Sequence, residues 1–560
     1  MTATVLVAVV IVPLVFMLAM SLRTGSPANP GDWTLANYQE VYGGAALYQT
    51  LGNTIVYALV TALISLSIAG GFAWLVERTD LPFRNVVWIV MLLPIAIPGM
   101  LSSMAWLLML TERVGIVNLA LRWLLGLAGM EMETGPLNIY SLGGMIFVES
   151  MRGVPTLFLM LVASFRLMDP SLEEAAGMAG ARTFASIRRI TAPLLLPVLL
   201  ATAMYGFIGN LDDFETPLLI GAPAGIFLLS TVIYFQTSDA VNWGIAAVYS
   251  TIFLIITVVL VAIYHRVVLR HVERFATLSS RAFKPRRVSL GRWRWPCFAG
   301  VMVFFFLSSG LPLLVLVWAS LLPAYEVPSM EALSKVSFDN YIEVATDPRV
   351  IDSIWNSFVL GIGTGVATML LAFFVGWAVV RIKVRGRFFL DALAFIPHAL
   401  PTVTIVVATI AFHLSPAMSW APLYGTMALM IIALTTRYIA FGTRTSNGAM
   451  AQLDASLEEA AAASGASKGT VLRKITAPLL LPAFLGGFIF VATHGFRNLT
   501  IPLMMAGHRN QTIASFMYTE WRHQADVSLV AAIGVFLVIG LTIATVLTRR
   551  MIVRGYTGQE

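Results

Sequence analysis

Apolar and polar segments alternate along this chain in a way that predicts its architecture. A helix rises 1.5 Å per residue, so about 20 apolar residues cross the ~30 Å hydrocarbon core of a bilayer. The sequence contains twelve runs of roughly this length, six in each half. They lie at about residues 3–22, 53–75, 86–110, 141–163, 194–210, 246–265, 297–322, 355–380, 388–412, 422–442, 479–496 and 527–548. The pattern predicts an all-α polytopic membrane protein.

The first run begins almost at the N-terminus and could be mistaken for a secretory signal peptide. It lacks the basic segment that opens a signal peptide, and no A-x-A cleavage site occurs before Asn37. We therefore expect this run to be a membrane span. We also expect the true start codon to lie upstream.

One polar stretch occurs twice. Residues 171–197 read SLEEAAGMAGARTFASIRRITAPLLLP and residues 456–482 read SLEEAAAASGASKGTVLRKITAPLLLP, with 17 of 27 positions identical. Each copy lies between apolar runs and carries basic residues, as is typical of short loops on the cytoplasmic side of a membrane. The chain is therefore a tandem duplication, and we expect its repeated loop to carry function.

The repeated loop has the pattern of a short helix. Ser171 and Ser456 each precede a glutamate by three residues, which is a capping-box pattern, and alanines follow. Gly180 and Gly465 lie where a two-turn helix would end, because glycine tolerates the left-handed conformation found there. A single capping box marks only a helix start in a surface connector. Two copies in register favour a helix that docks into a groove on another protein.

The loop resembles the EAA loop in the membrane permease subunits of binding-protein-dependent ABC importers. The matching residues are Glu174, Ala175, Ala176, Gly180, Ile190 and Pro193, and again Glu459, Ala460, Ala461, Gly465, Ile475 and Pro478. The resemblance implies the type I importer fold, with two six-helix permease domains in one chain. It also implies that each loop forms a coupling helix docked on a cytoplasmic ATPase. The leucine usual before the proline is alanine here, at Ala192 and Ala477.

Composition independently indicates a membrane protein. Hydrophobic residues make up 58% of the chain and charged residues 12%, and the mean hydropathy is +0.83. The formal net charge is +7, but the basic residues lie next to apolar runs, so topology and anionic lipid explain them better than nucleic acid does. The single cysteine, Cys297, excludes an internal disulfide and a cysteine-based metal cluster.

The distribution of Lys and Arg predicts the orientation. Residues 266–294 contain nine basic residues and one acid, Glu273, whereas residues 210–244 contain no basic residue and four acids. The central connection is therefore expected in the cytoplasm, together with both termini and both EAA loops. The even number of spans per half makes the two repeats parallel.

The duplication extends beyond the loop. Asn37, Asn53, Trp74, Pro94 and Pro98 recur as Asn340, Asn356, Trp377, Pro397 and Pro401, all at an offset of 303. The EAA loops are offset by 285, so the first half carries about 18 extra residues (303 minus 285), within residues 111–140. We expect a first permease domain at residues 1–275, a basic cytoplasmic linker at 276–296 and a second permease domain at 297–560.

Charged residues near membrane spans are candidates for the transport pathway, because charge in hydrocarbon is costly. Asp212, Asp213 and Glu215 follow the fifth apolar run, and repeat symmetry matches Asp212 with Arg497. Our hypothesis is that Asp212 and Arg497 line or gate the pathway, with Asp213 and Glu215 as further candidates. The plainer alternative is that they are solvated residues at a helix end.

Other polar residues in the apolar runs have simpler explanations. Arg152 and Arg437 match across the repeat and are expected to snorkel to the cytoplasmic interface, with Glu149 as a partner for Arg152. His398 matches Ile95, so no repeated pair of metal ligands exists, and a histidine bonded to a carbonyl at a helix kink is expected. No metal site is predicted.

The sequence carries no catalytic motif. A P-loop needs G-x-x-x-x-G-K-[ST], and the nearest stretch, residues 465–470 (GASKGT), has its lysine before the second glycine. We therefore expect no catalytic residues and no cofactor in this chain, and expect ATP and Mg to be bound by a partner ATPase.

The resemblance implies a permease of the bacterial inner membrane. Its partners would be two copies of a cytoplasmic ABC ATPase, an extracytoplasmic substrate-binding protein and the lipid bilayer. Residues 213–234 and 496–521 resemble the ferric iron group most, and thiamine or a phosphonate are the alternative substrates. An ion-coupled secondary carrier with six plus six spans is the alternative class. Such carriers use membrane-buried carboxylates, and apart from Glu149 the runs contain almost none.

Overall fold

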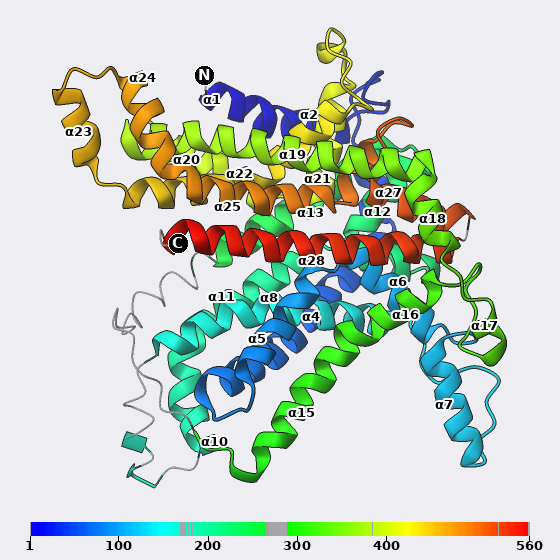
Figure 1. Ribbon diagram of the computed structural model, residues 1–560. Helices are drawn as coiled ribbons and strands as arrows, with labels where there is room; N and C mark the ends of the chain where they lie inside the picture. The colour runs from blue at the N-terminus through cyan, green and yellow to red at the C-terminus, as the bar shows by residue number, and fades with distance from the viewer. Residues whose placement is uncertain are drawn as a thin grey trace.

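The computed structural model describes residues 2–168, 175–176, 178–180, 183–264, 266, 288–382, 385–524 and 526–557 (Figure 1). Within these ranges the elements are helices joined by loops, and the only β-pairing is three isolated bridges. The predicted all-α polytopic fold is confirmed.

The membrane spans agree closely with the apolar pattern. Eight helices of the described residues are long and apolar enough to cross a membrane, and three bent helix pairs pass the same test when each is taken as one span. The eight are Thr2–Ser21, Ala45–Arg78, Leu142–Arg166, Arg188–Leu211, Trp243–Ile263, Gly291–Ser320, Pro348–Arg381 and Gly469–Phe496. Two further predicted runs lie on α22 (Met427–Gln452) and α28 (Val527–Thr557).

The third span of each half is broken in the middle. In the first half, α5 (Arg84–Leu92) and the 3-10 turn η2 (Leu93–Ala96) meet α6 (Gly99–Leu110) at 95°. In the second half, α20 (Arg387–Phe395) and η10 (Ile396–Ala399) meet α21 (Thr402–His413) at 110°. Pro98 and Pro401 lie directly before α6 and α21. Proline disfavours the helical conformation in the residue before it, so the first helix ends there, and proline is tolerated where the next helix starts. Each break places a helix end, whose backbone N–H or carbonyl groups have no intrahelical partner, inside the protein.

A third bent pair was not predicted. The π turn η4 (Pro217–Gly221) and the 3-10 turn η5 (Ala222–Ala224) meet α12 (Leu229–Ser238) at 79°. From the sequence, this segment lies between the fifth and sixth apolar runs, in a stretch with four acids and no basic residue. Leu218, Leu219 and Ile220 are buried, so the segment is instead packed into the protein.

The first helix of each half packs on the other half. Helix α2 (Val12–Ser21) contacts α21, and α1 (Thr2–Leu6) contacts α19 (Pro348–Gly376) and α20. Correspondingly, α15 (Arg294–Phe305) and α16 (Leu311–Ser320) contact α5 and α6, as Figure 1 shows. The linker predicted at residues 276–296 therefore separates two repeats in the sequence. In space, the first helix of each repeat contacts the other repeat. Most of that linker lies outside the described residues.

The duplication is visible in individual hydrogen bonds. The Asn37 side chain donates to the carbonyls of Ser21 and Arg23, and the Asn340 side chain donates to those of Ser320 and Leu322. In both halves the side chain closes the C-terminal end of the first span, where helix carbonyls have no intrahelical partner. The repeat therefore preserves local structure as well as topology.

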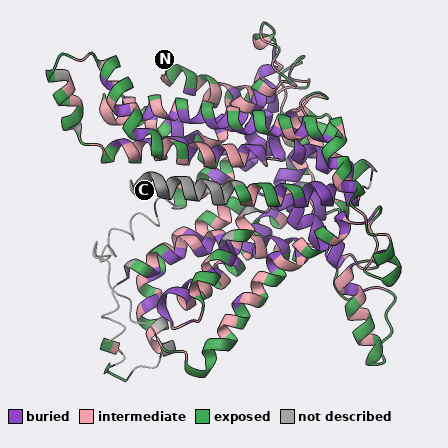
Figure 2. Ribbon diagram, in the orientation of Figure 1, coloured by how far each residue is buried: buried purple, intermediate pink, exposed green. Residues whose placement is uncertain are grey.

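Buried residues gather where the helices of the two halves meet (Figure 2). At one end of the molecule lie α10 (Thr183–Ser186) and α23 (Ala455–Ala463), and α23 is mostly exposed. At the opposite end, α7 (Ile116–Leu127) projects from the predicted insertion and exposes Trp123 and Leu127 (Figure 1). The repeated loops and the insertion therefore lie at opposite ends.

We expect Asn340→Ala to destabilise the protein. The substitution leaves the Ser320 and Leu322 carbonyls without their partner in a buried position, which costs about 1–3 kcal/mol. The measurement is the thermal midpoint in detergent, with Asn29→Ala, an exposed position, as the control. Equal midpoints for the two variants would contradict the assignment.

Candidate substrate pathway

A charged cavity of about 290 Å³ lies between the two halves. Its walls come from the break in the first-half third span, from α8 (Leu142–Leu167), from the segment after α11 (Ala192–Leu211), and from α21, α22 and α25 (Ala477–Phe496). Six charged residues line it: Arg152, Asp212, Asp213, Glu215, Arg437 and Arg497.

Asp212 joins the first half to the broken span of the second half. Its carboxylate accepts hydrogen bonds from the backbone N–H of Thr402 and, at 2.8 Å, from the Thr402 hydroxyl. Thr402 opens α21, so the carboxylate lies at a helix N-terminus, where free N–H groups and the helix dipole favour negative charge. Arg437 of α22 donates to the same carboxylate at 2.8 Å.

Arg497 makes the reciprocal contact from the second half. Its guanidinium donates at 2.8 Å to the carbonyl of Ile95, which lies at the end of the first part of the broken span in the first half. His494 Nδ1 lies 2.8 Å from the Phe490 carbonyl and therefore carries the proton. Its Nε2 is then an acceptor for Arg497, at 3.1 Å. A cation thus lies where free carbonyls favour positive charge.

Glu215 is positioned by the absence of a side chain at Gly99. The backbone N–H of Met100, in the first turn of α6, donates to the Glu215 carboxylate. A Cβ atom on Gly99 would lie 2.3 Å from Glu215 Oε2 and 2.9 Å from an Arg152 nitrogen. Only glycine lets both charged groups approach this helix start.

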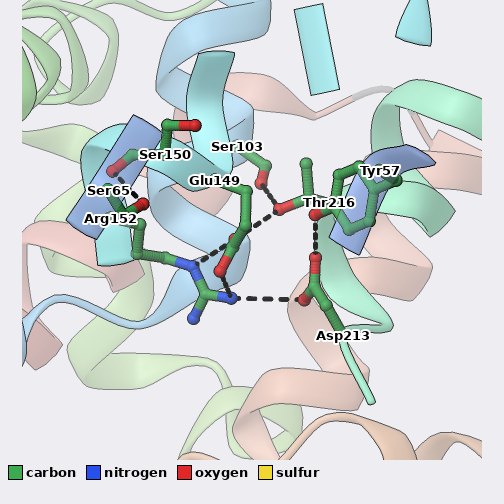
Figure 3. Close-up of polar contacts among 8 residues, drawn as sticks. All are labelled: Tyr57, Ser65, Ser103, Glu149, Ser150, Arg152, Asp213 and Thr216. Carbon is green, nitrogen blue, oxygen red and sulfur yellow. Dashed lines mark hydrogen bonds and ion pairs between the residues drawn. The ribbon is translucent and has the colours of Figure 1, made fainter. Parts of the chain in front are cut away.

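Arg152 organises a second network inside the first half (Figure 3). It pairs with Glu149 at 2.7 Å and with Asp213 at 3.2 Å. The Tyr57 hydroxyl donates to Asp213, and Thr216 donates to Glu149 at 3.3 Å. Glu149 and Asp213 are almost fully buried, so each carboxylate is compensated by a cation and by a neutral donor.

A mainly apolar cavity of about 260 Å³ adjoins the charged one. It is lined by Tyr205, Phe395 and His398, and it shares Gly209, Asp212 and Arg437 with the charged cavity. The Asp212–Arg437 ion pair therefore forms part of the wall between two spaces.

The structure brings all four predicted pathway residues, Asp212, Asp213, Glu215 and Arg497, to one cavity. Their role in transport stays a prediction. The expected pair of Arg152 with Glu149 is confirmed. The expectation that Arg152 and Arg437 snorkel to the cytoplasmic interface is wrong, because they pair with Asp213 and Asp212 in the cavity. The sequence did contain a sign of this pairing, because an arginine recurs at matched positions inside two apolar runs.

The second EAA loop forms the predicted short helix, α23, but begins earlier than expected. Ser456 lies inside the helix, and the Asp454 carboxylate accepts from its N–H at 2.9 Å, which lowers the pKa of Asp454. The predicted capping box at Ser456 is therefore wrong. Gly465 follows the helix with a φ of +82°, as predicted.

The predicted docking residues of this loop are Glu459, Ala460, Ala461 and Gly465, and all but the half-buried Ala461 are exposed. In the first EAA loop, Gly180 has a φ of +81°, Ala175 is exposed and Ala176 is half-buried. Glu174 and the capping residue Ser171 lie outside the described residues. The docking function of both loops stays a prediction.

Comparison with known proteins matches both halves of the chain to one family. The model of a family described as "Binding-protein-dependent transport system inner membrane component" matches residues 63–274 and again 368–555. The Fe(3+)-transport system permease protein FbpB 2 of Haemophilus influenzae is 22% identical over 86% of each chain. The putative ferric transport system permease protein FbpB 1 of the same organism is 24% identical over 79% of this chain and 68% of its own.

Among solved structures, a bacterial ABC transporter involved in the import of the acidic polysaccharide alginate is similar over 47% of this chain and 96% of its own. The TM-score is 0.38 at 16% identity.

We expect Gly99→Ala to destabilise the protein by about 1–3 kcal/mol, because its Cβ would push Glu215 and Arg152 apart at a packed helix start. Gly71→Ala is the matched control, since nothing lies within 4 Å of a Cβ there, and it should be neutral or stabilising by up to about 1 kcal/mol. Thermal midpoints of the two variants test this. A Gly99→Ala midpoint as high as that of Gly71→Ala would contradict the packing described.

Proposed function

Because the chain belongs to the family of binding-protein-dependent transport system inner membrane components, we propose that its two halves together form the substrate pathway of a ferric iron importer. Membership of this family assigns the chain to the permeases of ABC importers. It also separates the chain from the ion-coupled secondary carriers considered from its topology. The observation that carries the pathway is the charged cavity built from both halves.

Each half contributes to the closure of this cavity. Asp212 of the first half binds the start of α21, and Arg497 of the second half binds the carbonyl before α6. Hydrogen bonds to charged groups contribute about 1.5–3 kcal/mol each, so neither contact can be broken without a replacement. We propose that alternating access separates these contacts in turn, with replacement partners or water at each stage, and that ATP binding and hydrolysis in a partner drive the change.

The proposed partners are two copies of a cytoplasmic ABC ATPase and an extracytoplasmic substrate-binding protein. The two repeated loops lie at the same end of the molecule (Figure 1), as docking of two ATPase copies on one face requires. ATP and Mg would be bound by the ATPase, and this chain would contribute no catalytic group. The inner membrane would hold the chain with both termini and both loops in the cytoplasm, consistent with the basic residues in the loops.

The substrate is proposed from the relatives, which are named as ferric transport permeases. A phosphonate is the second candidate, because three guanidinium groups line the cavity and arginine binds phosphate-like groups in a bidentate manner. Thiamine is the third candidate, carried by family resemblance alone.

The substrate is best tested on the complete transporter. The chain is co-expressed with its ATPase, and uptake into proteoliposomes is measured with the purified binding protein and Fe(III), thiamine or aminoethylphosphonate. We expect ATP-dependent uptake of Fe(III) only. Uptake of aminoethylphosphonate or thiamine in place of Fe(III) would replace the substrate proposal, and ATP-independent uptake would overturn the importer mechanism.

Asp212→Asn should reduce uptake at least tenfold. The substitution removes the charge that binds Arg437 and the start of α21, and charge-assisted hydrogen bonds contribute about 1.5–3 kcal/mol each, where 1.4 kcal/mol is a factor of ten. Asp352→Asn, at an exposed position of α19, is the matched control and should transport normally. Normal uptake by Asp212→Asn at normal expression would remove Asp212 from the pathway.

A further inference from the structure

Two adjacent glutamates of the second EAA loop face different surroundings. Glu459, the residue of the EAA motif, is exposed. Glu458 contacts the ends of two membrane spans. It accepts a hydrogen bond from the Thr476 hydroxyl at 2.9 Å and pairs with Arg381 at 3.4 Å. Successive helical residues point about 100° apart, since there are 3.6 per turn, so one glutamate can contact the spans while its neighbour faces outward.

Arg381 brings the ends of further spans to this contact. It is the last residue of the π turn η9 (Trp377–Arg381), which continues the second span, α19. Another of its nitrogens donates at 2.9 Å to the carbonyl of Leu453, directly after α22. The Arg381 side chain is only 11% exposed, so its charge needs a local partner, and Glu458 supplies the anion.

Thr476 connects the contact to the cavity through one helix. It is the last residue of η12 (Leu472–Thr476) and directly precedes α25. Helix α25 has 20 residues, about 30 Å at 1.5 Å per residue, and ends at Phe496, directly before Arg497. The Glu458 contact and the Arg497 contact with Ile95 thus lie at the two ends of one helix.

The same arrangement of residue types recurs in the first half. Arg78 ends α4 (Ala45–Arg78) at the offset of 303, and Thr191 ends the π turn η3 (Ile187–Thr191) at the offset of 285. Both are almost completely buried. Helix α11 begins directly after Thr191 and ends at Leu211, the residue before Asp212. The residue that matches Glu458 is Glu173, which lies outside the described residues.

We propose that Glu458 is the positioning residue that transmits movement of the EAA helix to the membrane spans. The proposal rests on the proposed function, in which an ATPase docks on this helix. Helix α23 is flanked by the turn at Asp454 and by Gly465 in the left-handed conformation. Glu458 links this helix to the second span of the second half through Arg381 and to its fifth span through Thr476. Docking and transmission are therefore divided between Glu459 and Glu458.

The test separates docking from transmission. Glu458→Gln and the matched neighbour Glu459→Lys are each co-expressed with the ATPase, and three quantities are measured: ATPase retained on purification, ATP hydrolysis, and solute taken up per ATP. For Glu458→Gln we expect normal ATPase retention and continued hydrolysis, with uptake per ATP reduced at least tenfold. For Glu459→Lys we expect loss of the ATPase itself.

Two further variants exclude a folding defect as the cause. Thr476→Val removes the hydrogen bond and keeps the ion pair, so its loss of uptake per ATP should be smaller than that of Glu458→Gln. The charge exchange Arg381→Glu with Glu458→Arg re-forms the ion pair and should recover at least a third of the lost coupling. The thermal midpoint of Glu458→Gln should equal that of the unmodified chain, which a folding defect would not allow. Unchanged coupling in Glu458→Gln, its loss of the ATPase, or a charge exchange no better than the single variant would each overturn the proposal. Failure of the unmodified chain to retain any ATPase would instead overturn the proposed function.

Discussion

Charge buried between the two halves is the constraint on which the rest of this structure depends. Each third span is broken, which leaves helix N–H and carbonyl groups without intrahelical partners at the level of the cavity. Asp212 and Glu215 each accept a hydrogen bond from one of these N–H groups, and Arg497 donates to one carbonyl. The broken spans and the charged residues therefore explain each other, because neither is tolerable in hydrocarbon alone.

Fusion of the two halves in one chain allows them to differ where they meet. A symmetric pair would place identical charges at matched positions, and like charges near the axis repel. Here matched positions carry Asp212 and Arg497, so one half supplies an anion to a helix start and the other supplies a cation to a helix end. The exchanged first helices, with α2 on α21 and α16 on α6, hold the halves together around these contacts.

The sequence predicted the spans because the length and composition of an apolar run are local properties. It selected Asp212 and Arg497, which line one cavity, because the repeat aligns these two positions. It failed for Arg152 and Arg437, since snorkelling and pairing inside a cavity require the same residue in the same run and differ only in what the neighbouring helices provide. It also misplaced the start of α23, because Asp454 and Ser456 are both good capping residues and only the backbone path selects one.

The fifth span of each half, α11 or α25, begins in the last residues of the repeated loop and ends directly before a charged residue of the cavity. In the second half, Thr476 at the start of α25 meets the EAA helix, and Arg497 at the end of α25 meets the break in the other half. Gly361 and Gly365 of α19 pack against α25 without space for a Cβ, so these two helices are closely packed where they approach the Arg497 end. A close-packed pair shifts as a unit more easily than it deforms, since protein interiors have low compressibility. In the proposed coupling, displacement of α23 at one end would reach the Arg497 contact at the other through this helix pair, and coupling needs only that this contact have two arrangements of similar free energy.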